Sequence, residues 1–193
     1  MTVLVAGLVL FLAVHSLRIV APEMRARVMA ERGKNAWLLP YTAVSLAGFA
    51  LIVWGYGLAR MDPVFVYAPP IAPPIALRHV ALLVLLPVFP LLIAAYVPSR
   101  IRAAVGHPML VATILWALAH LMANGTLADV ILFGSFLVWA VIDWRSALAR
   151  PASSSAKVPA GWAGDAVAVL GGLAIYGVFV AGFHEWLIGV SPL

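Results

Sequence analysis

Long apolar runs are the feature that most limits what this chain can fold into. Six stretches carry so few charges that each can cross a bilayer as a helix of roughly 20 residues. Because 65% of the 193 residues are hydrophobic and only 10% are charged, a water-soluble domain of this length has too little polar surface. The sequence therefore predicts an all-α protein, a polytopic bundle of about six transmembrane helices in a lipid bilayer. The expected helices cover residues 2–21, 38–59, 77–97, 108–123, 127–142 and 165–189.

Signals for helix ends stand at the joint between the fourth and fifth runs. Pro108 is placed to be the first residue of a helix, where its missing N–H costs nothing. Asn124 and Gly125 are typical of a helix end. Thr126 followed by Asp129 forms a capping box, which predicts that the next helix begins directly after Thr126.

Prolines mark three further features. Pro87 and Pro90 are expected to kink the third helix, since a proline inside a helix removes a backbone hydrogen bond. The stretch YAPPIAPPIA, residues 67–76, is predicted to be extended and to lie on the membrane surface. RPASSSAKVPAG, residues 150–161, is predicted to be a flexible linker between the fifth and sixth helices.

Lysine and arginine are distributed unequally over the loops, which predicts an orientation. Of the 12 basic residues, only Arg60 and Arg78 lie on one side of the predicted bundle. Because basic loops stay on the cytoplasmic side, loops one, three and five are expected in the cytoplasm, with both termini on the opposite side of the membrane. The remaining ten lie in or beside those three loops: Arg18, Arg25, Arg27, Arg32, Lys34, Arg100, Arg102, Arg145, Arg150 and Lys157.

Composition excludes several kinds of chemistry. The chain has no cysteine, so disulfides, thiolate catalysis and cysteine-ligated metals are excluded. The net charge of +5 comes from short loops between apolar runs, which does not fit a nucleic-acid-binding surface. The sequence shows neither a nucleophile motif nor a phosphate-binding loop. Two of its acids within the spans are Asp129 and Glu185, and Asp129 is explained by its cap.

The five histidines are therefore the most informative residues. His79, His107 and His184 fall near the ends of predicted helices, where an imidazole reaches water, and their roles stay open. His15 and His120 lie well inside apolar runs on different helices. Polar groups at that depth usually face the interior of the bundle and have a partner there.

Two readings of His15 and His120 follow. They hold a metal or haem between them, because neutral imidazole is a common axial ligand. Alternatively, each makes an interhelical hydrogen bond that fixes helix packing. The depths of the two residues differ by roughly 10 Å at 1.5 Å per residue, and the lean of each side chain toward its helix N-terminus closes part of that gap. Pairs of His15 with His107 and of His120 with His184 also stay open.

Two neighbours of these histidines suit a cofactor. Arg18 follows His15 by one helical turn and is placed to meet a haem propionate at the cytoplasmic surface, although simple snorkelling also explains it. Asn124 shares the helix face of His120 and is placed to bond the other imidazole nitrogen.

Several segments together resemble the NnrU family of bacterial membrane proteins, and the resemblance runs through nearly the whole chain. Residues 107–145, HPMLVATILWALAHLMANGTLADVILFGSFLVWAVIDWR, are its most specific part. The resemblance implies a single NnrU-like transmembrane domain over residues 1–193 and a role in the expression or maturation of nitrite and nitric oxide reduction. The other segments are FLAVHSLRIVAP, SLAGFALIVWGYGLAR, LRHVALLVLLP and FHEWLIGVSPL.

NnrU proteins are related to the plant zeta-carotene isomerase, an integral membrane protein with haem b. Its histidine ligands match by motif His15 of HSLR and His120 of ALAH, so the resemblance implies haem b at these residues. The plant enzyme has a cysteine three residues before its second histidine, where this chain has Ala117. Exchange of an imidazole for a thiolate is therefore impossible here, and the resemblance supports haem binding more than isomerase activity.

Two other functions compete with a haem protein. One is a non-catalytic membrane factor that assembles or regulates denitrification enzymes, in which the histidines only fix helices. The other is an S-adenosylmethionine-dependent membrane methyltransferase, because GHPMLVA around His107 faintly resembles the R-H-P-x-Y-x-G segment of such enzymes. Haem, a denitrification-related membrane protein or a second copy of the chain are the partners these readings predict.

Overall fold

The chain is helical, as predicted. The computed structural model describes residues 1–67, 75–149 and 161–193. Within these ranges the only extended pairing is a single bridge between Phe65 and Thr126. Five of the described helices are long and apolar enough to cross a membrane, and Pro108–Ala123 is apolar but shorter. The expected all-α membrane bundle is thus confirmed.

The helix bounds follow the apolar runs, with additions between them. The predicted third helix is divided near Pro87, and two short helices that the apolar pattern did not predict, α2 and α6, lie between the runs. The Pro-rich stretch 67–76 and the linker 150–161 fall almost wholly outside the described residues. The elements are α1 Thr2–Val20, α2 Pro22–Arg32, α3 Lys34–Ala59, α4 Ile75–Leu85, α5 Val88–Ala94, α6 Arg100–Val105, α7 Pro108–Ala123, α8 Leu127–Ala149, α9 Trp162–Val178, the π-helical η1 Phe179–Phe183 and α10 His184–Ile188.

The described chain forms two compact units. The first consists of Met1–Tyr67 and Thr126–Trp139, and so contains α1, α2, α3 and the first part of α8. The second consists of Ala68–Gly125 and Ala140–Leu193. Each unit is described by itself below.

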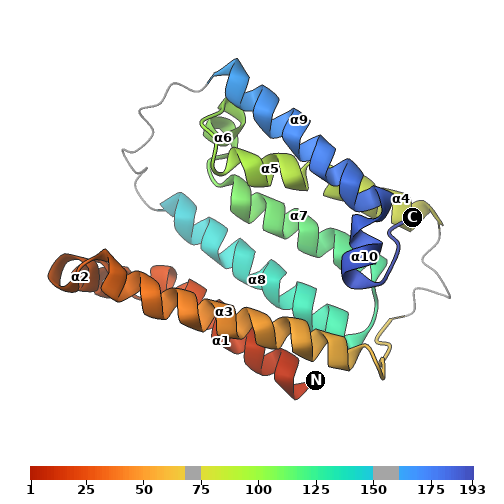
Figure 1. Cartoon of the computed structure of the whole chain (residues 1–193), viewed down its shortest axis with the longest axis horizontal. Coiled ribbons are helices and arrows are strands. Elements are labelled where there is room, and N and C mark those ends of the chain that lie inside the picture. The colour runs from red at the N-terminus through yellow and green to blue at the C-terminus, as the bar shows by residue number, and fades with distance from the viewer. Residues whose placement is uncertain (68–74, 150–160) are drawn as a thin grey trace. The chain divides into compact units, whose positions relative to one another are not determined.

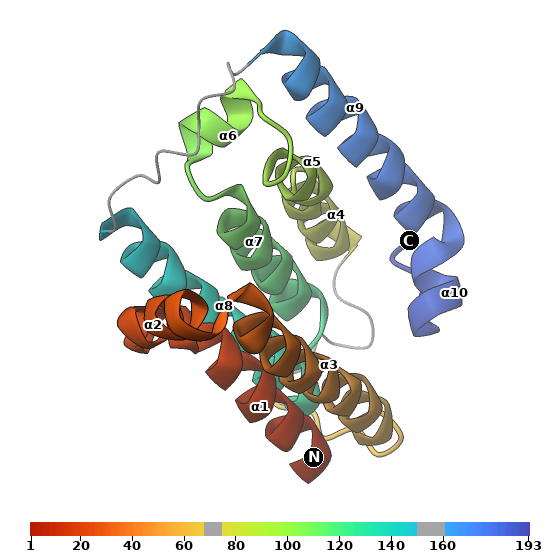
Figure 2. The same ribbon diagram turned by 60° about the vertical axis from the view of Figure 1, so that its left-hand side comes forward.

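Small residues let α1 and α3 lie in close contact in the first unit (Figures 1 and 2). A Cβ added at Gly7 would meet the backbone nitrogen of Ile52 at 2.6 Å, and one at Gly48 would meet that of Phe11 at 2.8 Å. A Cβ at Gly55 would overlap the backbone of Leu4. The three contacts keep one antiparallel register, which places His15 opposite the turn of α3 that holds Tyr41 and Ser45.

A buried carboxylate connects α8 to the end of α3. Asp129 is 4% exposed. Its Oδ2 accepts hydrogen bonds from the backbone N–H and the hydroxyl of Thr126, at 2.9 and 2.6 Å, and its own N–H donates to Thr126 Oγ1 at 3.2 Å. These reciprocal bonds confirm the capping box. Oδ1 of Asp129 accepts a hydrogen bond from the Tyr56 hydroxyl at 2.5 Å, so the capping residue also links α8 to α3.

The segment directly after α3 lies near the start of α8 and the same carboxylate. The N–H of Leu127 donates to the carbonyl of Val64 at 2.7 Å, beside the bridge from Phe65 to Thr126. Burial and the negative charge of Asp129 raise the pKa of Tyr67. Its phenol therefore stays protonated at neutral pH.

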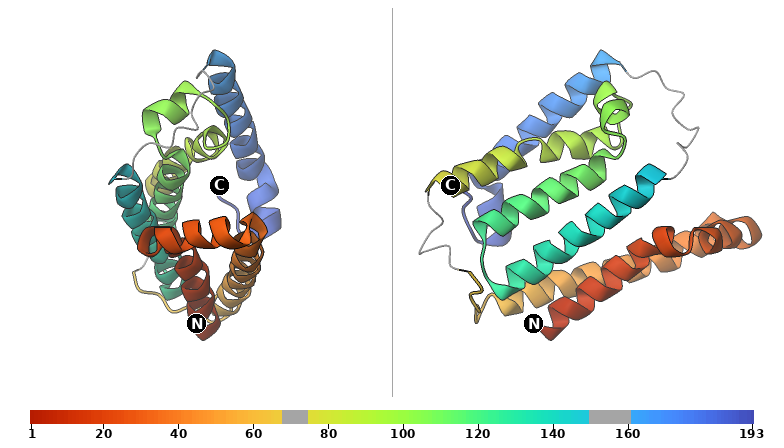
Figure 3. Two further views of the ribbon diagram at one scale, coloured as in Figure 1. Left: turned by 90° about the vertical axis from the view of Figure 1, so that its left-hand side faces the viewer. Right: turned by 180° about the vertical axis from the view of Figure 1, so that it is seen from behind.

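The second unit is built around α5, which contacts both α7 and α9 (Figure 3). The expected kink is confirmed, since α4 ends at Leu85 and α5 begins at Val88. Val88, Leu91 and Ala112 form a buried apolar cluster between α5 and α7. A Cβ at Gly172 would overlap the backbone of Pro90, so glycine is required where α9 contacts α5.

An ion pair joins the start of α6 to α9. Arg100 Nε donates to Asp165 Oδ2 at 2.5 Å, and the backbone N–H groups of Arg100 and Ile101 donate to Asp165 Oδ1 at 2.8 and 3.2 Å. The Arg100 guanidinium also lies 4.4 Å from the centroid of the Trp162 ring. Asp165 thus caps α6 from another helix.

The remaining predicted boundaries are confirmed at α7. The helix begins at Pro108 and ends with Asn124 as its C-cap. The sixth expected helix begins at Trp162 and is interrupted by a π-helical turn, in which Gly182 has φ +148°. That backbone conformation is open to glycine and strained for other residues.

Candidate functional site

His15 has the local geometry of a metal-ligating imidazole. The half-buried ring lies on α1, and its Nδ1 is 2.6 Å from the carbonyl oxygen of Phe11, one helical turn earlier. A carbonyl only accepts, so Nδ1 carries the proton and, in the neutral ring, Nε2 keeps its lone pair. Histidines that bind metals usually donate their other N–H in this way, which fixes the tautomer and the ring orientation.

Aromatic rings from three helices surround His15 in the first unit. The Phe11 ring stacks on the imidazole with centroids 4.1 Å apart. The Tyr41 ring of α3 lies at 5.3 Å, and the Trp139 ring of α8 lies edge-on at 6.1 Å. We call His15, Tyr41, Ser45 and Trp139 the His15 cluster.

Two polar atoms of the His15 cluster lack a close hydrogen-bond partner among the described residues, although the Ser45 hydroxyl interacts with the Tyr41 phenol. They are Trp139 Nε1 and Ser45 Oγ, and both are buried. A buried donor left unpaired costs about 1–3 kcal/mol, and native structures hold few of them. Trp144 Nε1, in the second unit, is also buried without such a partner.

His120 has the same local geometry in the second unit. Its Nδ1 is 2.8 Å from the carbonyl oxygen of Trp116, one turn earlier on α7, and the Trp116 ring lies 5.2 Å away. Asn124 Nδ2 donates to the backbone carbonyl of His120 at 3.0 Å. The expectation that Asn124 also bonds the His120 ring stays a prediction.

The two histidines belong to different units, so the expectation that they share one ligand stays a prediction. Arg18 lies exposed in the last turn of α1, three residues after His15. No group of three or more His, Asp or Glu side chains within residues 1–67, 75–149 and 161–193 is arranged to hold a bare metal ion. A haem iron needs only one or two protein ligands, because the porphyrin supplies the others.

The other three histidines have simpler surroundings. His79 is exposed on α4. His107 is the N-cap of α7, directly after Gly106, which has φ +73°. Nδ1 of His184 lies 2.7 Å from the carbonyl of Val190. The segment that faintly resembles a methyltransferase motif thus covers the turn between α6 and α7 and the start of α7.

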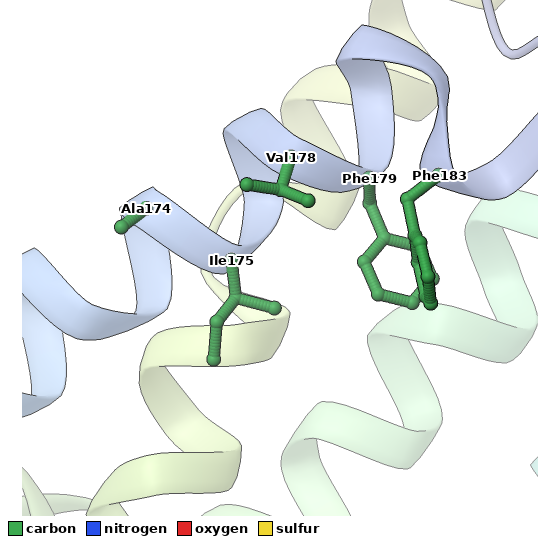
Figure 4. A pocket seen from close by; sticks show the side chains of 5 residues that line it. All are labelled: Ala174, Ile175, Val178, Phe179 and Phe183. Carbon is green, nitrogen blue, oxygen red and sulfur yellow. The ribbon is translucent and has the colours of Figure 1, made fainter.

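A shallow groove of about 350 Å³ lies along the end of α9 and η1 (Figure 4). The Phe179 and Phe183 rings lie side by side in it, with centroids 4.9 Å apart. An apolar lining of this kind is expected on a helix surface that faces lipid. The lining residues are Ala174, Ile175, Val178, Phe179 and Phe183.

Sequence reasoning found His15 but missed Tyr41, Ser45 and Trp139. Tyr41 and Ser45 are four residues apart, a spacing that puts them on one helix face. Both lie within an apolar run that holds other aromatic and small residues, so that signal is weak. Trp139 comes from a third helix, and only the fold brings it to His15.

The long apolar helices define a class, the polytopic α-helical membrane proteins. Within that class the chain belongs to the NnrU family, whose model, described as "NnrU protein", matches residues 3–192. No curated protein and no solved structure matches the chain.

Proposed function

We propose that this NnrU protein binds haem b, which His15 and His120 would hold through their imidazoles. The observation that carries the proposal is the His15 imidazole, whose Nδ1 is engaged by the Phe11 carbonyl at 2.6 Å while buried polar atoms beside it lack close partners. The matching geometry of His120 supports the second ligand. Haem held by these two residues would supply a redox-active iron.

The chain's own residues have definite tasks in this proposal. The carbonyls of Phe11 and Trp116 hold the two imidazole tautomers, with Nε2 left to bind iron. The rings of Phe11 and Tyr41 exclude water from His15. Arg18, at the end of α1, is placed to attract an anionic group at the membrane surface.

The proposed setting is the inner membrane of a bacterium, with both termini periplasmic and a function linked to denitrification. The excess of lysine and arginine in loops one, three and five supports this orientation. A non-catalytic membrane factor is the alternative, in which histidines fix helix packing. The hydrogen bond of His15 runs within its own helix, so it does not by itself favour that alternative.

Replacing the two histidines tests the proposal. We expect His15→Ala and His120→Ala each to shift the Soret band and to lower the haem content of the purified protein, because each removes an axial ligand. Added imidazole is expected to restore part of the wild-type spectrum by binding in the vacated position. The measurement is an oxidised and a dithionite-reduced absorption spectrum of each variant.

His79→Ala is the matched control, since His79 is exposed on α4 and has no proposed ligand role. Its spectrum is expected to equal that of the wild type. Wild-type spectra in both the His15 and His120 variants would show that neither imidazole binds iron.

A further inference from the structure

The polar atoms of the His15 cluster have a common chemical character. The Trp139 indole N–H can only donate a hydrogen bond, and the Ser45 hydroxyl is a second donor. Ser45 and the Tyr41 phenol lie on the same face of α3, and Arg25 lies within electrostatic range of Tyr41. Arg18 follows His15 by one turn. Hydrogen-bond donors and cations together suit a ligand that accepts hydrogen bonds and carries negative charge.

Shape restricts the ligand further. The Phe11, Tyr41 and Trp139 rings lie 4.1, 5.3 and 6.1 Å from the imidazole, so the surroundings of these donors are largely aromatic. A small inorganic anion would lose its hydration against these rings and gain few contacts. A planar apolar molecule that carries carboxylates satisfies both the rings and the donors.

We infer that Trp139 and Ser45 bind the carboxylate groups of the haem, and that Trp139 is the main donor. The inference rests on the proposed haem function and extends it by assigning two binding residues on α3 and α8. It accounts for both atoms, because a carboxylate has two oxygens and about four positions that accept hydrogen bonds. A hydrogen bond to a charged acceptor is roughly twice as strong as a neutral one.

The test compares two probes on apoprotein in detergent. Haemin carries free carboxylates, and haemin dimethyl ester carries the same ring and iron without the negative charges. Trp139→Phe keeps most of the aromatic surface and removes the N–H. We expect it to weaken haemin binding roughly tenfold or more, from the loss of a charged hydrogen bond, and to weaken ester binding much less. Soret titration gives both affinities.

Two further variants keep the test decisive. Ser45→Ala is a small change that suits a helix, and it provides a test even if Trp139→Phe folds poorly. It is also expected to weaken haemin binding more than ester binding. Trp144→Phe is the matched control, because Trp144 Nε1 is also buried without a partner but belongs to the second unit. It is expected to bind both probes as the wild type does.

The outcomes separate the inference from the function on which it rests. Equal losses for haemin and ester in the Trp139 and Ser45 variants, or no loss for either probe, would overturn the carboxylate contacts and leave haem binding in place. A wild-type protein that binds neither probe would overturn both proposals. A loss confined to haemin in these variants, with Trp144→Phe unchanged, would establish the contacts.

Discussion

Replacing Gly55 with alanine is expected to destabilise the protein by about 3 kcal/mol or more, the upper end of the range for overpacking. A Cβ at this position would overlap the backbone of Leu4 on α1. Backbone atoms cannot rotate aside as a side chain can, so α1 and α3 must separate. Without a hydrophobic driving force between helices in lipid, such close contacts supply much of the association energy.

Gly57→Ala is the matched control, because nothing lies within 4 Å of a Cβ added there. Alanine is favoured over glycine inside a helix by roughly 0.5–1 kcal/mol, so this variant is expected to be neutral or slightly more stable. Unfolding in mixed micelles of increasing sodium dodecyl sulfate, followed by circular dichroism, measures both. Equal stabilities of the two variants would show that α1 and α3 do not approach as described.

Replacing Asp129 with alanine is expected to have the second large effect, a loss of about 3 kcal/mol. The change removes the acceptor of the Tyr56 hydroxyl and of both Thr126 donors. Those groups lie near a carboxylate that is only 4% exposed, so little water is available to replace it. The carboxylate half of the capping box is lost at the same time, whereas the bond from the backbone N–H of residue 129 to Thr126 Oγ1 remains.

Two controls distinguish loss of the Asp129 hydrogen bonds from the general effect of removing a carboxylate. Tyr56→Phe removes a single hydrogen bond and is expected to cost about 1 kcal/mol. Asp62→Ala removes a carboxylate that lies exposed, and its unfolding curve is expected to match the wild type. An Asp129→Ala variant as stable as Asp62→Ala would contradict the described network.

Much of the fold could be predicted because its causes are local. The apolar runs gave the long helices, Pro108 and Asn124 gave the bounds of α7, and Thr126 with Asp129 gave the start of α8. The helices α2 and α6 were missed, since they are short and carry many charges between the runs. Part of the capping of α6 comes from another helix, because Asp165 of α9 accepts from two of its N–H groups, and Ser99 supplies the local cap.

The site was predicted less completely, for a physical reason. The cost of a polar group in an apolar run singles out His15 and His120 without knowledge of the fold. Tyr41 and Trp139 do not stand out in the sequence in this way, because aromatic side chains are common in membrane proteins. The Tyr56 contact with Asp129 was also missed, since a complete capping box already explained the acid.

The central claim is that this protein carries haem b, and an absorption spectrum tests it most directly. The protein is purified from cells supplied with ample haem, and a pyridine haemochrome assay gives the haem content per chain. Sharp bands in the dithionite-reduced spectrum and about one haem b per chain are the predicted result. A colourless preparation under the same conditions would contradict the claim and favour a membrane factor without a cofactor.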